Sequence, residues 1–427
     1  MSFVEVLPVT DSFSLKINDI APDKSISHRS AMFAMLADGE SVITNFLRAE
    51  DTLNTLKIVE NLGAKVLDDG TTIKISSSGI KEPSEILDCG NSGTGMRLFC
   101  GLLSSANGHF VLTGDEYLRR RPMKRVTNPL ISIGAKLDGR KEGDLAPLSI
   151  RGASLKSFDY VSKIASAQVK SCMILAALRA DGVCKYSEPE LSRDHTERML
   201  KGMGADVVVD GLTTTITPMQ NLLSPLSIRV PADPSSAFFF AVACAITPNS
   251  SIILEGITLN STRIEAFKVL QKMGADITYD IIDDKYEPIG NITVKYAPLK
   301  GVIVEENISW LIDELPALSI AMACADGESI VKNAEELRVK ESDRISTVVD
   351  GLKSCSIMVD EYDDGYKITG GVFKKATVDS DGDHRIAMSF IIAGLKCGMK
   401  VTDLDCINTS FPNFFELLEK ITKVELN

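Results

Sequence analysis

Lys24, Ser25 and Arg29 stand just before a stretch that turns apolar, and their types suit the binding of an anion. From Ser30 onward, small and apolar residues predict a short buried helix that ends at a glycine cap, Gly39. Hydroxyl groups at a helix start can bind free backbone N–H groups, and Lys and Arg beside this positive end attract anions such as phosphate. The sequence therefore predicts an anion site here.

Other stretches of the first half also carry polar groups into predicted helices. The glycine-rich run 91–97 can bring backbone N–H groups close to a ligand, because glycine has no Cβ atom. In the basic run 119–125, Pro122 suits the first turn of a helix and so places Arg121 at the helix start. A flexible turn and a solvated charge run are the alternatives for these two runs.

Hydroxyl, amide and guanidinium groups in the runs 166–170 and 193–197 suit a hydroxylated, phosphorylated ring, although helix capping explains them nearly as well. In the run 338–344, a helix would place Lys340 and Arg344 on one face, with Glu341 between two cations. A surface helix with ion pairs is the alternative. The groups expected to gather are Lys24, Arg29, Arg121, Lys340, Arg344 and Arg385, with Asp313 and Glu341 as acid–base groups.

These stretches belong to an internal repeat. Six segments open with polar residues and turn apolar, which indicates six units of about seventy residues each. The segments are residues 21–41, 91–103, 165–178, 233–246, 313–325 and 383–395. A Gly-Ala pair that ends a polar-faced helix and precedes a strand follows each of the first four segments, at residues 63, 134, 204 and 274.

Length and composition bound what six units can build. A chain of 427 residues suggests two domains of three units each. The prolines at residues 20–22 and 230–234 place one domain at residues 21–231 and the other at residues 1–20 with 232–427. We expect an α/β fold with sheets outside, repeat helices buried inside, and polar helix starts facing an interdomain cleft.

Net charge and cysteine content restrict the partners and the compartment. The net charge of −12 disfavours nucleic acid and anionic membranes, although residues 21–231 hold 26 Lys and Arg against 24 Asp and Glu, compared with 20 against 34 elsewhere. The longest apolar run, 238–246, is too short to span a bilayer. No amino-terminal targeting segment is visible, and nine cysteines without metal-ligand spacing argue against a disulfide framework or zinc site. We therefore expect a cytoplasmic protein.

Four motifs carry a resemblance to a known family that extends over essentially the whole chain. The runs 22–29, 90–97, 338–344 and 383–385 closely resemble the signatures of 5-enolpyruvylshikimate-3-phosphate synthase, or 3-phosphoshikimate 1-carboxyvinyltransferase. The resemblance implies a two-domain inverse α/β barrel of sixfold repeated units. It also implies transfer of the enolpyruvyl group of phosphoenolpyruvate to the 5-hydroxyl of shikimate 3-phosphate, releasing phosphate, in the pathway to chorismate and aromatic amino acids. No metal or organic cofactor is implied.

The resemblance also implies roles for single residues. Contacts to shikimate 3-phosphate are implied for Lys24, Ser25, Arg29, Ser166, Ala167, Gln168, Arg193, Asp313 and Lys340. Contacts to phosphoenolpyruvate are implied for Lys24, Gly93, Arg121, Gln168, Arg344 and Arg385. Asp313 and Glu341 would move protons, with Lys24 assisting. A monomer that closes its cleft on anionic ligands is expected, with glyphosate as an inhibitor at the phosphoenolpyruvate site.

Departures from the usual motifs resemble the family's second, less glyphosate-sensitive class. Leu98 follows Arg97 where many members have proline, Thr409 replaces a frequent lysine, and Glu336 replaces a frequent asparagine. Two other functions stay open. The related transferase that uses UDP-N-acetylglucosamine has asparagine after its lysine, where Ser25 stands here. A non-catalytic binder of phosphorylated metabolites would not need both proposed acids.

Overall fold

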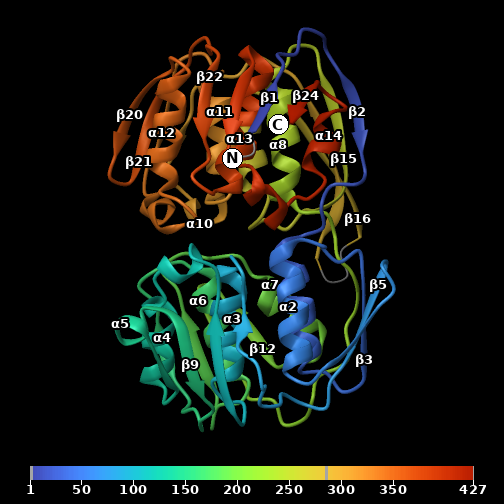
Figure 1. Ribbon diagram of the computed structural model, residues 1–427, viewed down its shortest axis with the longest axis vertical. Coiled ribbons are helices and arrows are strands. Elements are labelled where there is room, and N and C mark those ends of the chain that lie inside the picture. The colour runs from blue at the N-terminus through green and yellow to red at the C-terminus, as the bar shows by residue number, and fades with distance from the viewer. Residues whose placement is uncertain (1–2, 284–286, 427) are drawn as a thin grey trace. The chain divides into compact units, whose positions relative to one another are not determined.

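The computed structural model describes residues 3–283 and 287–426 of the chain (Figure 1). The chain divides into two compact units: residues 22–230 form one, and residues 1–21 together with 231–427 form the other. The first unit is thus inserted into the sequence of the second. Among the helices of the described residues, none is long and apolar enough to cross a membrane.

Residues 22–230, all of which are described, contain three four-stranded sheets of one topology. In each sheet the first strand pairs in parallel with the second, and the remaining pairs are antiparallel. Across the sheets, the strands are β14 (Ser227–Arg229), β3 (Glu40–Thr44), β5 (Thr72–Ser76) and β4 (Lys65–Asp68); β6 (Leu87–Asp88), β7 (His109–Thr113), β9 (Leu145–Arg151) and β8 (Lys136–Gly139); and β10 (Asp159–Val161), β11 (Cys184–Ser187), β13 (Thr213–Ile216) and β12 (Val207–Asp210). Alternation explains the strands: Ile73 and Ile75 of β5 are buried while Lys74 between them is exposed.

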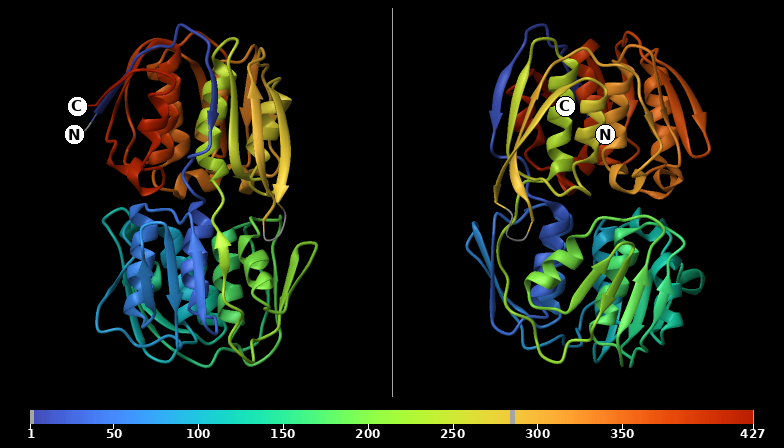
Figure 2. Two further views of the ribbon diagram at one scale, coloured as in Figure 1. Left: turned by 90° about the vertical axis from the view of Figure 1, so that its right-hand side faces the viewer. Right: turned by 180° about the vertical axis from the view of Figure 1, so that it is seen from behind.

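The repeat helices of this unit lie inside the sheets, as Figures 1 and 2 show. The buried helices are α1 (Lys24–Ala34), α3 (Gly93–Leu103) and α6 (Ala167–Ala177), and the others are α2 (Glu50–Asn61), η1 (Leu118–Arg120), α4 (Lys124–Ser132), α5 (Arg140–Gly143) and α7 (His195–Gly202). Helices α3 and α6 approach closely at Gly101, where an added Cβ would lie 2.1 Å from the carbonyl oxygen of Cys172. Glycine therefore permits the close packing of the last turns of α3 against the middle of α6.

The other unit repeats the same topology within its described residues. Its strands, in order across three four-stranded sheets, are β2 (Ser14–Ile17), β15 (Ser251–Thr258), β17 (Ile289–Lys295) and β16 (Asp276–Asp283); β18 (Ile303–Val304), β19 (Glu328–Val331), β21 (Gly365–Thr369) and β20 (Met358–Tyr362); and β22 (Ala376–Asp379), β23 (Met399–Thr402), β1 (Phe3–Val6) and β24 (Val424–Leu426). Again the first pair of each sheet is parallel and the others are antiparallel.

Three repeat helices form the core of this second unit (Figure 2). They are α8 (Pro234–Ile246), α11 (Leu315–Ala323) and α13 (His384–Cys397), and the surrounding helices are α9 (Glu265–Lys272), α10 (Ile308–Leu311), η2 (Glu335–Val339), α12 (Arg344–Ser354), η3 (Asp405–Thr409) and α14 (Phe414–Leu418). Every residue of α8 is buried, as an apolar surface on all sides requires. Phe240, Phe411 and Phe414 pack with ring centroids 5.5–6.0 Å apart. The predicted α/β fold with six repeated units, buried helices and outer sheets is confirmed.

Candidate active site

The first repeat helix begins earlier than its apolar residues suggest. α1 starts at Lys24, because Oδ1 of Asp23 accepts a hydrogen bond from the backbone N–H of Ile26 at 2.9 Å and caps the first turn. The prediction that this helix begins at Ser30 and ends at a glycine cap is wrong. Gly39 instead lies in the turn before β3, with a φ of +117°. The predicted anion contacts are thus part of the helix itself.

Two cations of α1 already contact protein groups. Lys24 forms an ion pair with the buried carboxylate of Asp51 on α2. Arg29 is also buried: its Nε donates to Oγ1 of Thr196 at 2.7 Å, and its Nη2 donates to Oγ of Ser171 at 2.9 Å. Because these hydroxyls belong to α7 and α6, Arg29 holds the start of α1 against both helices.

The glycine-rich run forms the start of α3. Ser92 caps this helix, which begins at Gly93, by accepting a hydrogen bond from the backbone N–H of Gly95 at 2.9 Å. The Ser92 hydroxyl lies 3.2 Å from Nε2 of His28, whose Nδ1 lies 2.7 Å from the hydroxyl of Thr55. Burial, together with the nearby cations of α1, holds the pKa of His28 well below its usual value. A neutral imidazole therefore fixes the cap of α3.

Arg121 faces this loop from a different position than the sequence suggests. It follows η1 in an extended conformation, and α4 begins only at Lys124, so the placement of Pro122 in a first helical turn is wrong. Nη2 of Arg121 donates a hydrogen bond to Oδ1 of Asn91. A Cβ atom at Gly93 would lie 3.1 Å from Nη1 of Arg121. The absence of a side chain there lets the guanidinium approach the start of α3.

Gln168 links the start of α6 to the start of α3. Its Oε1 accepts a hydrogen bond from Nη1 of Arg97, and its Nε2 donates to Oγ1 of Thr94 at 3.0 Å. Nη2 of Arg97 also donates to the carbonyl of Pro122 at 3.1 Å. Since Ser166 is the N-cap residue of α6, this network sets the orientation of the whole helix start.

In the other unit, Arg344 binds three carboxylates. Its Nε lies 2.7 Å from Oδ2 of Asp383, its Nη2 lies 2.8 Å from Oε2 of Glu341, and its Nη1 lies 3.2 Å from Oδ1 of Asp313. The Arg344 side chain is 1% exposed. Although burial opposes the charge, these carboxylates raise the pKa of Arg344. Arg344 thus joins the two predicted acids through one guanidinium.

The run 338–344 is not one continuous helix. η2 ends at Val339, the backbone of Lys340 is non-helical, and α12 begins at Arg344 with Asp343 as its cap. The prediction that Lys340 and Arg344 share a helical face is therefore wrong. Nζ of Lys340 lies 2.9 Å from Oε1 of Glu336. Burial lowers the pKa of Lys340, and the attraction of Glu336 opposes this shift without cancelling it.

Arg385 is buried at the start of α13, where Oδ1 of Asp383 accepts a hydrogen bond from its backbone N–H at 2.8 Å. Its side chain stacks over Phe239, with 5.8 Å from the guanidinium carbon to the ring centroid. Nε and Nη1 of Arg385 are buried and have no acceptor among the described residues. Buried donors of a charged group need a partner, so these two atoms indicate where an anion binds.

The predicted site residues form two groups by unit. Residues 22–230 hold Lys24, Ser25, Arg29, Gly93, Arg121, Ser166, Ala167, Gln168 and Arg193, and residues 231–427 hold Asp313, Lys340, Glu341, Arg344 and Arg385. The predicted set omitted groups that bind or orient these side chains, namely His28, Asp51, Asn91, Arg97 and Asp383. Four of them, all except Asp51, lie inside the motif runs 22–29, 90–97 and 383–385, so membership of a motif was the available signal.

Solved structures show which class of enzyme has this fold. The structure of EPSP synthase from Acinetobacter baumannii superposes with a TM-score of 0.88 at 39% sequence identity, covering 100% of both chains. An enolpyruvyl transferase from Streptomyces tendae shares the fold with a TM-score of 0.78 at 15% identity, covering 100% of this chain and 99% of the other. The fold is thus that of the enolpyruvyl transferases.

Sequence comparisons identify the family within this class. A model of the family described as EPSP synthase (3-phosphoshikimate 1-carboxyvinyltransferase) matches residues 13–418. The 3-phosphoshikimate 1-carboxyvinyltransferase of Sulfurimonas denitrificans is 77% identical over 425 residues, covering 100% of this chain and 99% of the relative. That of Nitratiruptor sp. is 64% identical over 431 residues, again covering 100% and 99%. The chain belongs to the EPSP synthase family, which confirms the predicted family.

Proposed function

We propose that the protein transfers the enolpyruvyl group of phosphoenolpyruvate to the 5-hydroxyl of shikimate 3-phosphate and releases phosphate. This is the carboxyvinyl transfer of its family, in the shikimate pathway to chorismate and aromatic amino acids. The observation that carries the proposal is Arg385, whose buried Nε and Nη1 have no acceptor among the described residues. The anionic substrates of this reaction would supply one.

Residues 22–230 supply most of the contacts proposed for shikimate 3-phosphate. The proposed contacts are Lys24, Ser25, Arg29, Ser166, Ala167, Gln168 and Arg193, with Asp313 and Lys340 from the other unit. The starts of α1 and α6 offer backbone N–H groups and hydroxyls suited to a phosphate and ring hydroxyls. The hydrogen bonds of Arg29 to Thr196 and Ser171 hold these helix starts in a fixed relation.

The phosphoenolpyruvate contacts that we propose are Lys24, Gly93, Arg121, Gln168, Arg344 and Arg385. Because a Cβ at Gly93 would lie 3.1 Å from Nη1 of Arg121, glycine lets this guanidinium come close to the start of α3, and a carboxylate or phosphate oxygen would bind the guanidinium there. Arg344 binds carboxylates of the protein in this structure, so substrate binding would exchange one of these contacts for the substrate.

The reaction needs three proton transfers. Addition of the 5-hydroxyl to C2 of phosphoenolpyruvate removes the hydroxyl proton and places a proton on C3, and elimination of phosphate removes a proton from the resulting methyl group. We assign the C3 proton to Glu341 and the hydroxyl proton to Asp313, with Lys24 assisting. The shared contact of both carboxylates with Arg344 supports this assignment, because one guanidinium fixes the two acids relative to each other.

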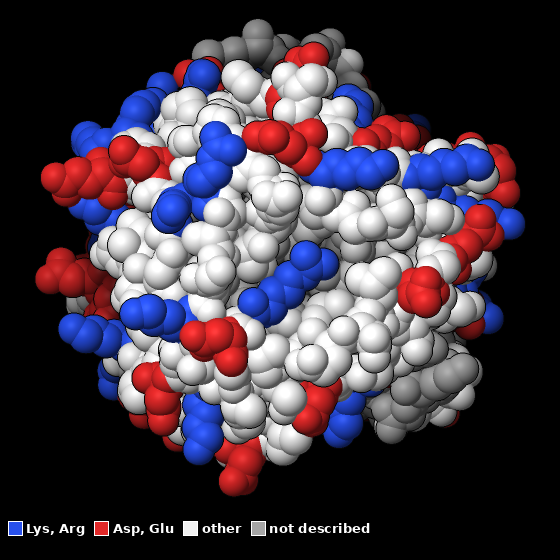
Figure 3. All heavy atoms as spheres, turned by 90° about the horizontal axis from the view of Figure 1, so that it is seen from below, with Lys and Arg blue, Asp and Glu red and all other residues white. Residues whose placement is uncertain are grey.

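We further propose that the enzyme works as a cytoplasmic monomer without nucleic-acid partners. The net charge of −12 supports the last point. On the face shown in Figure 3, Lys and Arg as well as Asp and Glu are scattered over a largely uncharged surface, and neither sign gathers into one continuous patch. Sedimentation of the free protein at the mass of two chains would contradict the monomer.

Phosphate release tests the proposed function against its two rivals. We expect release from phosphoenolpyruvate only when shikimate 3-phosphate is also present. Release with UDP-N-acetylglucosamine in its place would identify the related transferase instead. Binding of both substrates without any phosphate release would identify a non-catalytic binder.

As the pH is raised, we expect the affinity for shikimate 3-phosphate to fall. The fall should begin at a lower pH than it would if the anion were bound by a lysine with an ordinary pKa. Lys340 binds the anion as an ammonium, and burial lowers the pKa of this side chain below that of an ordinary lysine. Raising the pH through this lowered pKa removes the charge and weakens binding. Dissociation constants measured between neutral and alkaline pH check this. In Lys340→Arg the guanidinium stays charged, so an unchanged pH dependence in that variant would contradict the assignment.

We also propose membership of the less glyphosate-sensitive class. Leu98, which is buried in α3 directly after Arg97, replaces the proline of many members and can shift the helix start that carries Gly93. Glyphosate should compete with phosphoenolpyruvate for the site but should bind less tightly than phosphoenolpyruvate binds. The inhibition constant compared with the KM for phosphoenolpyruvate checks this. Inhibition as tight as substrate binding, or tighter, would refute the reduced sensitivity.

A further inference from the structure

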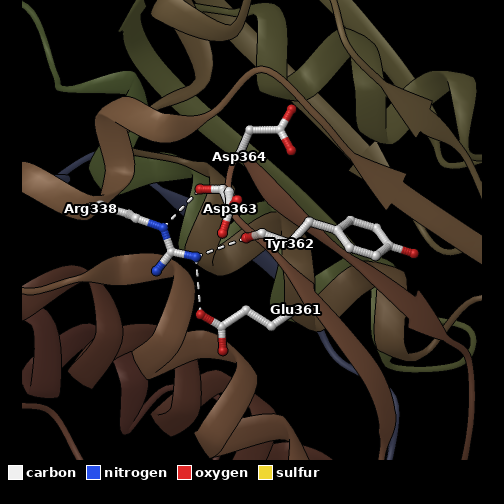
Figure 4. Close-up of a pocket in the computed structure, with 5 residues that line it drawn as sticks. All are labelled: Arg338, Glu361, Tyr362, Asp363 and Asp364. Atoms are coloured by element: carbon white, nitrogen blue, oxygen red, sulfur yellow. Dashed lines mark hydrogen bonds and ion pairs between the residues drawn. The ribbon is translucent and has the colours of Figure 1, made fainter.

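Arg338 lies in a pocket beside the turn of the β20–β21 hairpin (Figure 4). Its Nε donates to the carbonyl of Asp363 at 2.8 Å, and its Nη2 donates to the carbonyl of Tyr362 at 2.8 Å and to Oε1 of Glu361 at 3.0 Å. A guanidinium has five N–H donors in a rigid fork. Three of them therefore hold the end of η2 against this hairpin.

The remaining donors of Arg338 bind the start of α12. Its Nη1 donates to Oδ2 of Asp343 at 2.7 Å and to Oγ of Ser346 at 3.2 Å. The other carboxylate oxygen of Asp343 caps α12 by accepting from the backbone N–H of Ser346. The Ser346 hydroxyl in turn donates to Glu361 at 2.9 Å. All five donors of Arg338 thus have acceptors.

These contacts close a short loop of the chain. The backbone from Arg338 to Asp343 leaves η2 and enters α12. The two ends of this loop are joined by the hydrogen bond from Nη1 of Arg338 to Oδ2 of Asp343 at 2.7 Å. Lys340 and Glu341 lie within this loop. The hairpin side is further fixed by the backbone N–H of Ala334, which donates to the carbonyl of Asp364 at 2.7 Å. Neither helix alone determines where the loop lies, because Lys340 has a non-helical backbone.

We propose that Arg338 is a positioning residue for the transfer reaction: by bridging the β20–β21 turn and the start of α12, it sets the positions of Lys340 and Glu341. This inference rests on the proposed function for the role of those two residues. Arg338 itself need not touch either substrate, since its five donors are all used within the protein. Misplacement of a catalytic group by 1 Å can cost about 10²-fold in rate.

The variants Arg338→Met and Arg338→Lys test this role. Both should lower kcat by about tenfold or more and raise the KM for shikimate 3-phosphate, because Glu341 and Lys340 move together. Lysine should not rescue, since a point charge with three donors cannot replace a fork with five. Lys367→Met is the matched control, because Lys367 pairs with Glu328 at 3.1 Å and with Asp360 at 3.6 Å on the same sheet, and neither carboxylate is a partner of Arg338.

Hydrogen exchange of the backbone amides 339–343 gives a readout that does not depend on activity. Exchange should be faster in both Arg338 variants than in wild type and in the control. If Arg338→Met fails to fold, exchange and kinetics of the milder variant Arg338→Lys test the proposal. Exchange and kinetics like those of the control, or full rescue by lysine, would overturn the proposal. A wild-type enzyme without phosphate release would instead overturn the proposed function.

Discussion

Glu341→Gln should lower turnover by about 10²–10⁴-fold, the usual contribution of a general acid or base, while substrate affinity changes little. Glutamine keeps the shape of the side chain and an oxygen that can accept from Nη2 of Arg344, now 2.8 Å from the carboxylate. It cannot deliver or remove the C3 proton. Steady-state kcat and KM for both substrates check this prediction. A residue that acts only in the transition state should lower kcat when it is replaced and leave KM nearly unchanged.

Glu328→Gln is the control for this change. Its carboxylate also pairs with a cation, Lys367 at 3.1 Å, but the Glu328 side chain is exposed. This variant should keep turnover close to that of wild type. Near-normal turnover in Glu341→Gln, or a loss of affinity in parallel with rate, would make Glu341 a structural ion-pair partner of Arg344 and contradict its role in proton transfer.

Lys170→Met should reduce the free energy of unfolding by about 3–5 kcal/mol, the usual cost of removing one partner of a buried ion pair. Lys170 is 0% exposed, and its Nζ lies 2.7 Å from Glu188 and 2.8 Å from Glu197. It also donates to the carbonyl of Ser192 at 3.0 Å. Methionine fills the space but leaves two buried carboxylates without their cation. Urea unfolding followed by circular dichroism measures the loss.

Lys185→Met provides the comparison for this stability change. Lys185 lies on β11 of the same unit with an exposed side chain, so its replacement should change stability by no more than about 0.5 kcal/mol. Equal unfolding midpoints for the two variants would show that the buried cluster contributes no more than a surface charge. That result would contradict the account of Lys170.

The six repeats could be predicted because each unit switches from polar to apolar residues at one point. The switch does not locate the start of α1, however, and the spacing of charges in the run 338–344 does not locate the start of α12. In α1 the side chain of Asp23 caps a first turn that still carries polar residues. In α12 Asp343 caps the helix just before Arg344 and separates it from Lys340. Capping by one side chain therefore outweighed the periodicity on which the prediction relied.

The partners of the cations could not be read from spacing. Arg344 binds Asp313, Glu341 and Asp383, and two of these three are separated from it by more than thirty residues of sequence. Pairing of this kind depends on which repeat helices meet in the core. The family motifs identify such residues as important, but only the fold shows that Arg344 holds both acids. The partners of Arg338 on the β20–β21 hairpin are also distant in sequence. The run 338–344 alone therefore could not show that Arg338 has a different role from its neighbours.

Transfer in deuterated water, followed by the mass of the product, tests the central claim most directly. Addition and elimination convert the methylene of phosphoenolpyruvate into a methyl group and back. One of the three methyl hydrogens leaves, so solvent deuterium delivered by Glu341 should remain in much of the product. We predict a product with the mass of shikimate 3-phosphate plus the enolpyruvyl group, enriched in deuterium at C3. A product of the same composition without deuterium, or no product, would contradict the account.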